Sequence, residues 1–338
     1  MNEPNPETAP VEATALAAHK DRSAGLVVFG ILTILLGALV GLMILLVLAG
    51  QAVAANSPNP PPKAVTLLPV IAIYGTLTVA LVWLGIGSIM ARRWARALLL
   101  IFSWSWLVMG VFMTLVMAFV IPKVLANLPA DTTAGKPAMP PGAIAGIMVV
   151  MFLVFGVGFI VLPAVWTFFY RSPHVKATCE TRDPVTRWTD ACPLPVLGLC
   201  LWLMVSVPMM LVMPIAGHGV VPFFGMFLMG VPGTLFCLAI AALWSYAAWL
   251  LYRLDVRGWW LILIAFVVFM ASALLTYAQH DIVEMYQLMG YPEAQIEQIQ
   301  KTGLLTGNRM SWFTVLSVLP FLGYLCFVKK YLQRKTPV

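Results

Sequence analysis

The sequence predicts an all-α membrane protein, a polytopic bundle of about eight transmembrane helices. The first observation is composition: 61% of the residues are hydrophobic and only 10% are charged, whereas soluble domains are about 25% charged. The second is that the apolar runs are continuous, which indicates helices rather than the alternating strands of a barrel. At about 20 apolar residues per crossing, 338 residues have room for eight helices joined by short loops.

The first apolar run, 25–49, follows a polar segment, 1–24, that we expect to be a disordered cytoplasmic tail. The run carries no charge and is longer than the roughly 7 to 15 apolar residues of a signal peptide. We therefore predict a retained transmembrane helix. Cleavage after the A-x-A pattern at 52–54, which would leave seven helices, stays open as the alternative.

Seven further apolar runs follow, separated by loops rich in proline or arginine: 64–90, 97–121, 143–170, 196–216, 221–251, 259–279 and 310–328. They divide the chain into a four-helix unit (25–170), a polar cytoplasmic hinge loop (171–194) and a second four-helix unit (195–338). Proline inside a helix removes a backbone hydrogen bond. The cluster Gly230, Pro232 and Gly233 is therefore predicted to break the sixth run, and it is a candidate functional position.

The two units match in pattern, which indicates an internal repeat. In each, the second helix ends in a turn containing arginine and tryptophan, and both 161–163 and 318–320 read Val-Leu-Pro. Four helices is an even number, so the repeats would be parallel and related by an axis along the membrane normal. The alternative is that any two four-helix units with positive cytoplasmic loops look somewhat alike.

The basic residues predict the orientation. If the N-terminus is cytoplasmic, 15 of the 20 Lys and Arg residues fall on the cytoplasmic side, where such residues accumulate. We therefore expect a cell-membrane protein, in a bacterial inner membrane, with both termini cytoplasmic. The net charge of +7 orients helices in this reading, so no nucleic acid is expected as a partner; the expected partners are the lipid bilayer and other membrane proteins.

The hinge loop is the densest polar segment and the first candidate functional loop, through His174, Cys179, Glu180, Asp183, Arg187 and Asp190. It contains no CxxC pair, so no metal site is predicted. A disulfide between Cys179 and Cys192 is disfavoured by the reducing cytoplasm. The favoured interpretation is a compact loop whose three acids pair with Arg171, Arg182 and Arg187. A catalytic or ligand-binding loop is the alternative.

The second candidate cluster lies on the outer face and comprises His218, His280 and Glu284. On a continuing helix His280 and Glu284 would share a face, a spacing that can serve a metal or a proton. The alternative, and the favoured interpretation, is solvated residues at helix ends. The segment that follows, 282–305, has apolar faces and predicts two short surface helices, the second starting at Pro292.

No phosphate-binding glycine loop, G-x-S-x-G or H-E-x-x-H motif occurs. No Asp, Glu, Lys, Arg or His lies within the eight predicted spans, which disfavours proton relays and ion-coupled transport. The sequence therefore favours a binding or scaffold component, for a partner protein or a lipid, without an evident catalytic site or cofactor. A transporter of an uncharged or amphipathic small molecule is the alternative, and a membrane enzyme using the hinge loop is the second alternative.

Overall fold

The computed structural model describes residues 20–54, 64–126, 141–291, 293, 296–297, 300 and 307–332. The described chain is helical apart from one two-stranded hairpin. Seven of its helical segments are long and apolar enough to cross a membrane: Ser23–Val53, Val70–Ile89, Arg93–Ala118, Met148–Arg171, Leu194–Ile215, Gly230–Tyr252 and Val256–Gln279. The prediction of a multi-pass, all-α membrane protein is thereby confirmed, with seven candidate spans.

The eighth predicted span, 310–328, lies within the helix α13 (Gly307–Leu332). That helix is not among the seven candidate spans, so an eighth crossing stays a prediction. The predicted N-terminal tail up to residue 19 lies outside the described residues. So does most of the short helix predicted to start at Pro292.

The chain divides into two compact units, the first made of Met1–Phe112 with Val150–Ala191 and the second of Met113–Val149 with Cys192–Val338. In the first unit, α2 (Ser23–Ala54) packs along α3 (Ala64–Ile89). The two helices approach closely at a pair of glycines, because a Cβ on Gly30 would lie 2.8 Å from Gly85 O and one on Gly85 would lie 2.7 Å from Gly30 O. Phe29 of α2 also stacks on Phe169 at 4.1 Å.

Phe169 belongs to a long helix that changes its winding, from α5 (Pro141–Gly156) through the π-helical segment η1 (Val157–Val161) to α6 (Leu162–Arg171). Pro163 has no N–H to offer the carbonyl of Phe159 four residues earlier, which accounts for a wider turn at this point. That carbonyl lies against Gly110 of α4 (Arg93–Ala126), where an added Cβ would come within 1.9 Å of the oxygen. Gly110 therefore leaves room for the carbonyl.

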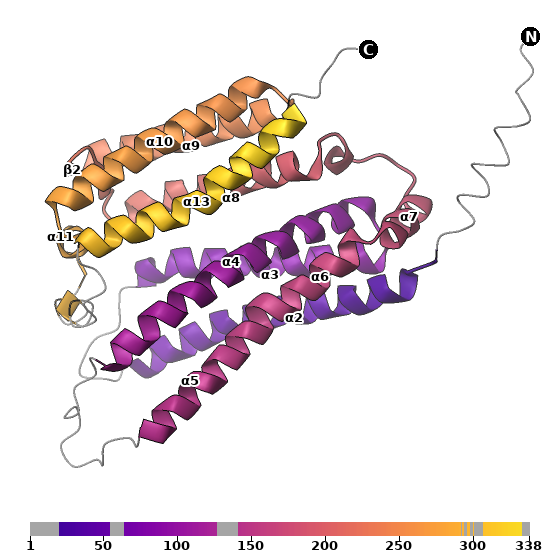
Figure 1. Cartoon of the computed structure of the whole chain (residues 1–338), viewed down its shortest axis with the longest axis horizontal. Coiled ribbons are helices and arrows are strands. Elements are labelled where there is room, and N and C mark those ends of the chain that lie inside the picture. Colours follow the sequence, from indigo (N-terminus) through magenta and orange to yellow (C-terminus); the bar gives the residue numbers. More distant parts are fainter. Residues whose placement is uncertain are drawn as a thin grey trace, which may run out of the picture. The chain divides into compact units, whose positions relative to one another are not determined.

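Four long helices of the second unit, labelled in Figure 1, contact one another in a closed order. α8 (Leu194–Ala216) contacts α9 (Gly230–Tyr252), α9 contacts α10 (Val256–Gln279), α10 contacts α13, and α13 contacts α8. Pro208 and Pro214 lie inside α8, which nevertheless remains one helix.

The predicted sixth helix, 221–251, is wrong in its first third. Residues 221–228 form an antiparallel hairpin, β1 (Val221–Phe223) and β2 (Met226–Leu228). The turn has positive φ at both Phe224 (42°) and Gly225 (88°), the combination of a type I′ two-residue hairpin turn. Pro222 is tolerated because a two-stranded hairpin has only edge strands.

The helix begins at Gly230, so the cluster Gly230, Pro232 and Gly233 lies in its first turn and does not break a helix in mid-membrane. Proline is well suited to a first turn, where its missing N–H would have had no partner within the helix. The predicted helix break is therefore corrected to a helix start.

Candidate functional site

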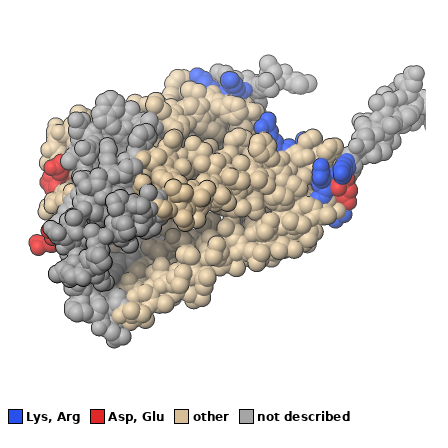
Figure 2. Space-filling view, turned by 60° about the horizontal axis from the view of Figure 1, so that its bottom comes forward, with Lys and Arg blue, Asp and Glu red and all other residues tan. Residues whose placement is uncertain are grey.

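The predicted hinge loop folds onto the first unit as a structured element. After α6 ends at Arg171, α7 (Pro173–Arg182) follows, then the short 3-10 helix η2 (Trp188–Asp190). We call residues 173–191 the charged loop. It lies at one end of the first unit, where Figure 2 shows the blue and red atoms together at the right of the view.

Asp183 is the centre of the charged loop. Its side chain is only 2% exposed, and Oδ2 accepts a hydrogen bond from the backbone N–H of Arg93 at 3.3 Å. Oδ1 accepts a hydrogen bond from Arg187 Nη2 at 3.3 Å and lies 3.6 Å from Arg92 Nη1. A buried carboxylate is stable only when it is paired and hydrogen-bonded, and Asp183 is both.

The other two acids are paired as well. Glu180 Oε1 lies 3.7 Å from Arg93 Nη2 and 3.8 Å from Lys176 Nζ. Asp190 lies 3.5 Å from Arg93 Nε and accepts a hydrogen bond from the backbone N–H of Arg187 at 2.9 Å. All three acids of the charged loop are thus neutralised by nearby cations.

The prediction that the three acids pair with basic residues is confirmed. Of the three arginines predicted as their partners, Arg187 pairs with one of the acids, and Arg171 and Arg182 do not. Arg182 pairs with Asp21 at 3.6 Å, and the cations that replace the predicted ones come largely from the turn between α3 and α4. Arg93 and Asp183 are 90 residues apart in the chain. In the sequence, Arg92 and Arg93 served as a signal of orientation and of the internal repeat, and nothing identified them as partners of the charged loop.

The cysteines in and near the charged loop are buried free thiols. Cys179 and Cys192 are buried and unpaired, as are Cys200 and Cys237. Burial raises the pKa of the Cys179 and Cys192 thiols to about 11, so both are protonated near neutral pH and are poor nucleophiles and metal ligands. Among the described residues, no group of three or more His, Cys, Asp or Glu side chains is placed to hold a metal ion.

His174 lies in the first turn of α7. It takes part in the loop through its backbone carbonyl, which accepts a hydrogen bond from Thr178 Oγ1 at 2.8 Å. The candidate residues of the charged loop are therefore brought together, but as a neutralised network in which the acids are occupied and the thiols are buried.

In the second unit, His280 and Glu284 lie at helix ends and contact each other. His280 Nδ1 lies 2.8 Å from Glu284 Oε2, and His280 Nε2 lies 3.1 Å from Gly225 O in the hairpin turn. Both partners are hydrogen-bond acceptors, so only the doubly protonated imidazolium can donate to both. The two residues do not lie on one continuing helix. α10 ends at Gln279, and α11 (Ile282–Leu288) is a separate helix.

His218 makes a separate contact. Its Nδ1 lies 3.1 Å from Met289 O, and its own carbonyl accepts a hydrogen bond from the N–H of Gly230 at 2.9 Å. Gly233 leaves room for the carbonyl of Gly219, because an added Cβ would lie 1.7 Å from Gly219 O. The Gly230 cluster thus packs the start of α9 against the preceding turn.

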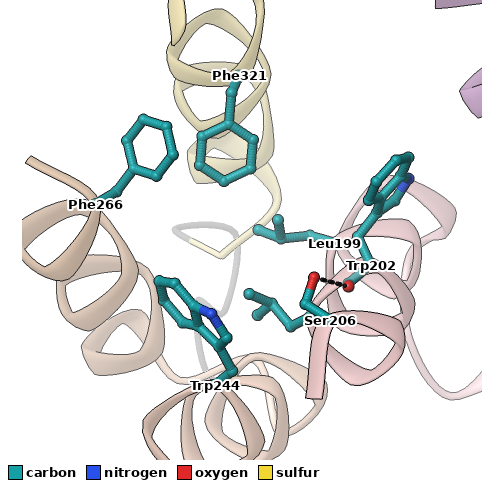
Figure 3. Close-up of a pocket in the computed structure, with 7 residues that line it drawn as sticks. Leu199, Trp202, Ser206, Trp244, Phe266 and Phe321 are labelled. Atoms are coloured by element: carbon teal, nitrogen blue, oxygen red, sulfur yellow. Dashed lines mark hydrogen bonds between the residues drawn. The ribbon is translucent and has the colours of Figure 1, made fainter. Parts of the chain in front are cut away.

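The sequence did not predict a cavity of about 170 Å³ in the second unit. The seven side chains that line it come from all four helices and are shown in Figure 3: Leu199, Trp202, Leu203, Ser206, Trp244, Phe266 and Phe321. Six are ordinary apolar residues of membrane helices, so no sequence signal could have brought them together.

Comparison of the chain with protein-family models, with curated proteins and with solved structures finds no match.

Proposed function

We propose that this multi-pass membrane protein binds a lipid or a partner protein and catalyses no reaction of its own. The observation that carries the proposal is the neutralised network of the charged loop. A catalytic acid or nucleophile needs an accessible group whose protonation is poised for the reaction. The acids of the charged loop are occupied by cations, and Cys179 and Cys192 are buried thiols with a raised pKa.

The charged loop also offers a surface for binding. Between α7 and the end of η2, Val185 and Trp188 are 58% and 47% exposed. Tryptophan is favoured at the level of lipid headgroups and in protein interfaces. A loop already fixed by ion pairs loses little conformational entropy when it binds, which favours association.

For the membrane arrangement, we propose eight crossings with both termini cytoplasmic, in a bacterial inner membrane. The support is the division of the basic residues, 15 to five, between the two sides. The charged loop then lies on the cytoplasmic side.

We also propose that the two predicted four-helix segments, 25–170 and 195–338, are repeats of one ancestral unit. The two arginine-containing turns have matching backbones. Ala91 (φ 51°) and Leu254 (φ 59°) are both non-glycine residues in the left-handed region, which is uncommon. In each turn the next N–H donates to the carbonyl five residues earlier, from Arg92 to Gly87 O at 2.9 Å and from Asp255 to Leu250 O at 3.0 Å, the helix ending called a Schellman motif.

The alternatives have less support. A transporter would be supported by the internal repeat and by a helix break near Gly230, but Gly230 begins α9. The cavity of the second unit also has an almost entirely apolar lining. An enzyme that used the charged loop would need the groups that the ion pairs occupy.

A photo-crosslinking amino acid at Val185 tests the proposal in membranes. We expect irradiation to give a discrete product with one lipid class or one protein. The matched control is Phe224, an exposed apolar residue in the hairpin turn of the second unit, which should not give that product. No product at Val185, or the same mixture from both positions, would refute the proposed binding surface.

A further inference from the structure

The cavity of the second unit lies between its helices and is partly open at their surface, since one of its lining residues, Trp202, is 45% exposed. Ser206 is near the middle of α8, Phe266 near the middle of α10, and Phe321 lies in the second half of α13. Four residues come from α8, and one each comes from α9, α10 and α13. In a bilayer about 30 Å thick in its hydrocarbon region, the middle of a span is far from the lipid headgroups and ester groups.

The lining excludes charged and strongly polar ligands. None of the seven lining residues is ionisable near neutral pH. The one hydroxyl is used within its own helix, because Ser206 Oγ donates to the carbonyl of Trp202 at 2.8 Å, the dashed line in Figure 3. An ion or a sugar would lose its hydration and gain almost nothing in return.

One donor in the wall remains available. Within the described residues, the indole N–H of Trp244 makes no hydrogen bond. Figure 3 shows its nitrogen on the side of the ring that faces the centre of the cavity. A donor without a partner in the hydrocarbon region is unfavourable. A hydrocarbon chain end could fill the space but could not accept this hydrogen bond, and a water molecule would need at least two polar partners.

The size and the walls favour a ring. A cavity of about 150 Å³ lined by Leu, Ile and Phe is large enough for benzene, and this one is about 170 Å³. The ring centroids of Phe266 and Phe321 lie 4.5 Å apart, and the ring planes are tilted by 43°. Two tryptophans also line the cavity. Aromatic rings pack well against such faces and edges.

We propose that this cavity binds a small, uncharged, ring-containing molecule with one hydrogen-bond acceptor, which receives the indole N–H of Trp244. This site is separate from the charged loop and goes beyond the function proposed above.

Fluorine NMR of the full chain in lipid nanodiscs tests the site with two probes of similar size, 4-fluoroacetophenone and 4-fluorotoluene. The ketone has a carbonyl acceptor and the toluene has none. We expect a saturable bound signal that empty nanodiscs lack, with the ketone bound roughly tenfold more tightly, as one hydrogen bond would give. Trp244→Phe keeps a ring but removes the donor, and it should abolish that preference while the toluene still binds.

Two filling variants locate the binding. Ser206→Leu should remove the bound signal of both probes by occupying the cavity, and Leu203→Phe fills it from another position on the same helix if the first variant does not fold. Thermal unfolding of each variant establishes that it is folded. The proposal is overturned if no saturable signal appears beyond that of empty nanodiscs, which would mean that lipid chains fill the space. It is also overturned if both probes bind equally to the wild type, or if a folded filling variant still binds them.

Discussion

The buried carboxylate of Asp183 accepts a hydrogen bond from the backbone N–H of Arg93, a residue 90 positions earlier in the chain. Arg93 is the first residue of α4. The bond therefore places a negative charge at the N-terminus of that helix, where the helix dipole stabilises it. Together with the ion pair between Arg92 and Asp183, it ties the charged loop to the turn between α3 and α4.

The first prediction concerns this tie. Asp183→Asn should lower the free energy of unfolding by about 1.5 to 3 kcal/mol, the usual contribution of hydrogen bonds to charged groups, because two hydrogen bonds and the ion pair with Arg92 lose a buried charged acceptor. Glu180→Gln is the matched control: Glu180 is 40% exposed, and exposed ion pairs contribute about 0 to 1 kcal/mol. Unfolding in detergent followed by circular dichroism measures both. Equal effects would contradict the central role of Asp183.

The sequence predicted the spans well because the bilayer imposes a length of about 20 apolar residues on each helix. It failed at 221–229, where the chain stays apolar although its backbone turns into a hairpin. Hydropathy does not change there, and the residues that mark the hairpin are local. They are Pro222 and Gly225, whose φ is positive in the structure.

The candidate site was predicted in part for a similar reason. The acids of the charged loop stand out because they are rare in this chain, and their pairing follows from burial. Their partner Arg93 could not be predicted, because it is brought to them by the packing of the first unit. The cavity around Trp244 could not be predicted either, since its residues are typical of any membrane helix.

The second prediction concerns the thiols. Because burial raises the pKa of Cys179 and Cys192 to about 11, iodoacetamide at pH 7.5 should modify both slowly in the folded protein and rapidly in denaturing detergent. Mass spectrometry of the modified peptides gives the rates. Replacing both cysteines by serine should leave folding and metal content unchanged. Rapid modification of the folded protein, or zinc that the double variant loses, would contradict this account.

The third prediction concerns His280. Its pKa is raised above the ordinary value of about 6.5, first by its hydrogen bond with Glu284 and also by its contact with Gly225 O. The stability that this group contributes is fully present below its unfolded-state pKa and is lost as pH rises through the raised folded-state pKa.

His280→Gln should therefore lower the thermal midpoint at pH 5.5 and have a smaller effect at pH 9. Glu284→Gln, which removes the largest cause of the shift, should reduce the pH dependence without abolishing it. A His280→Gln effect that is the same at both pH values would show that the imidazolium does not stabilise the hairpin turn.

The fourth prediction concerns the contact between Gly110 and the carbonyl of Phe159. Gly110→Ala should destabilise the first unit by about 1 to 3 kcal/mol, as overpacking does, because a backbone oxygen cannot move aside cheaply. Gly156→Ala is the control, since nothing lies within 4 Å of the position of its added Cβ. If thermal unfolding shows equal midpoints for the two variants, the close approach of these helices does not limit stability.

The proposal that this protein acts by binding is tested most directly by native mass spectrometry of the full chain, released gently from membrane-derived nanodiscs. A binding or scaffold protein should appear with a discrete, stoichiometric lipid or protein partner. Arg182→Glu, which reverses the charge of an exposed residue three positions before Val185 in the chain, should weaken that association. A bare polypeptide as the only species, from the wild type and the variant alike, would contradict the account.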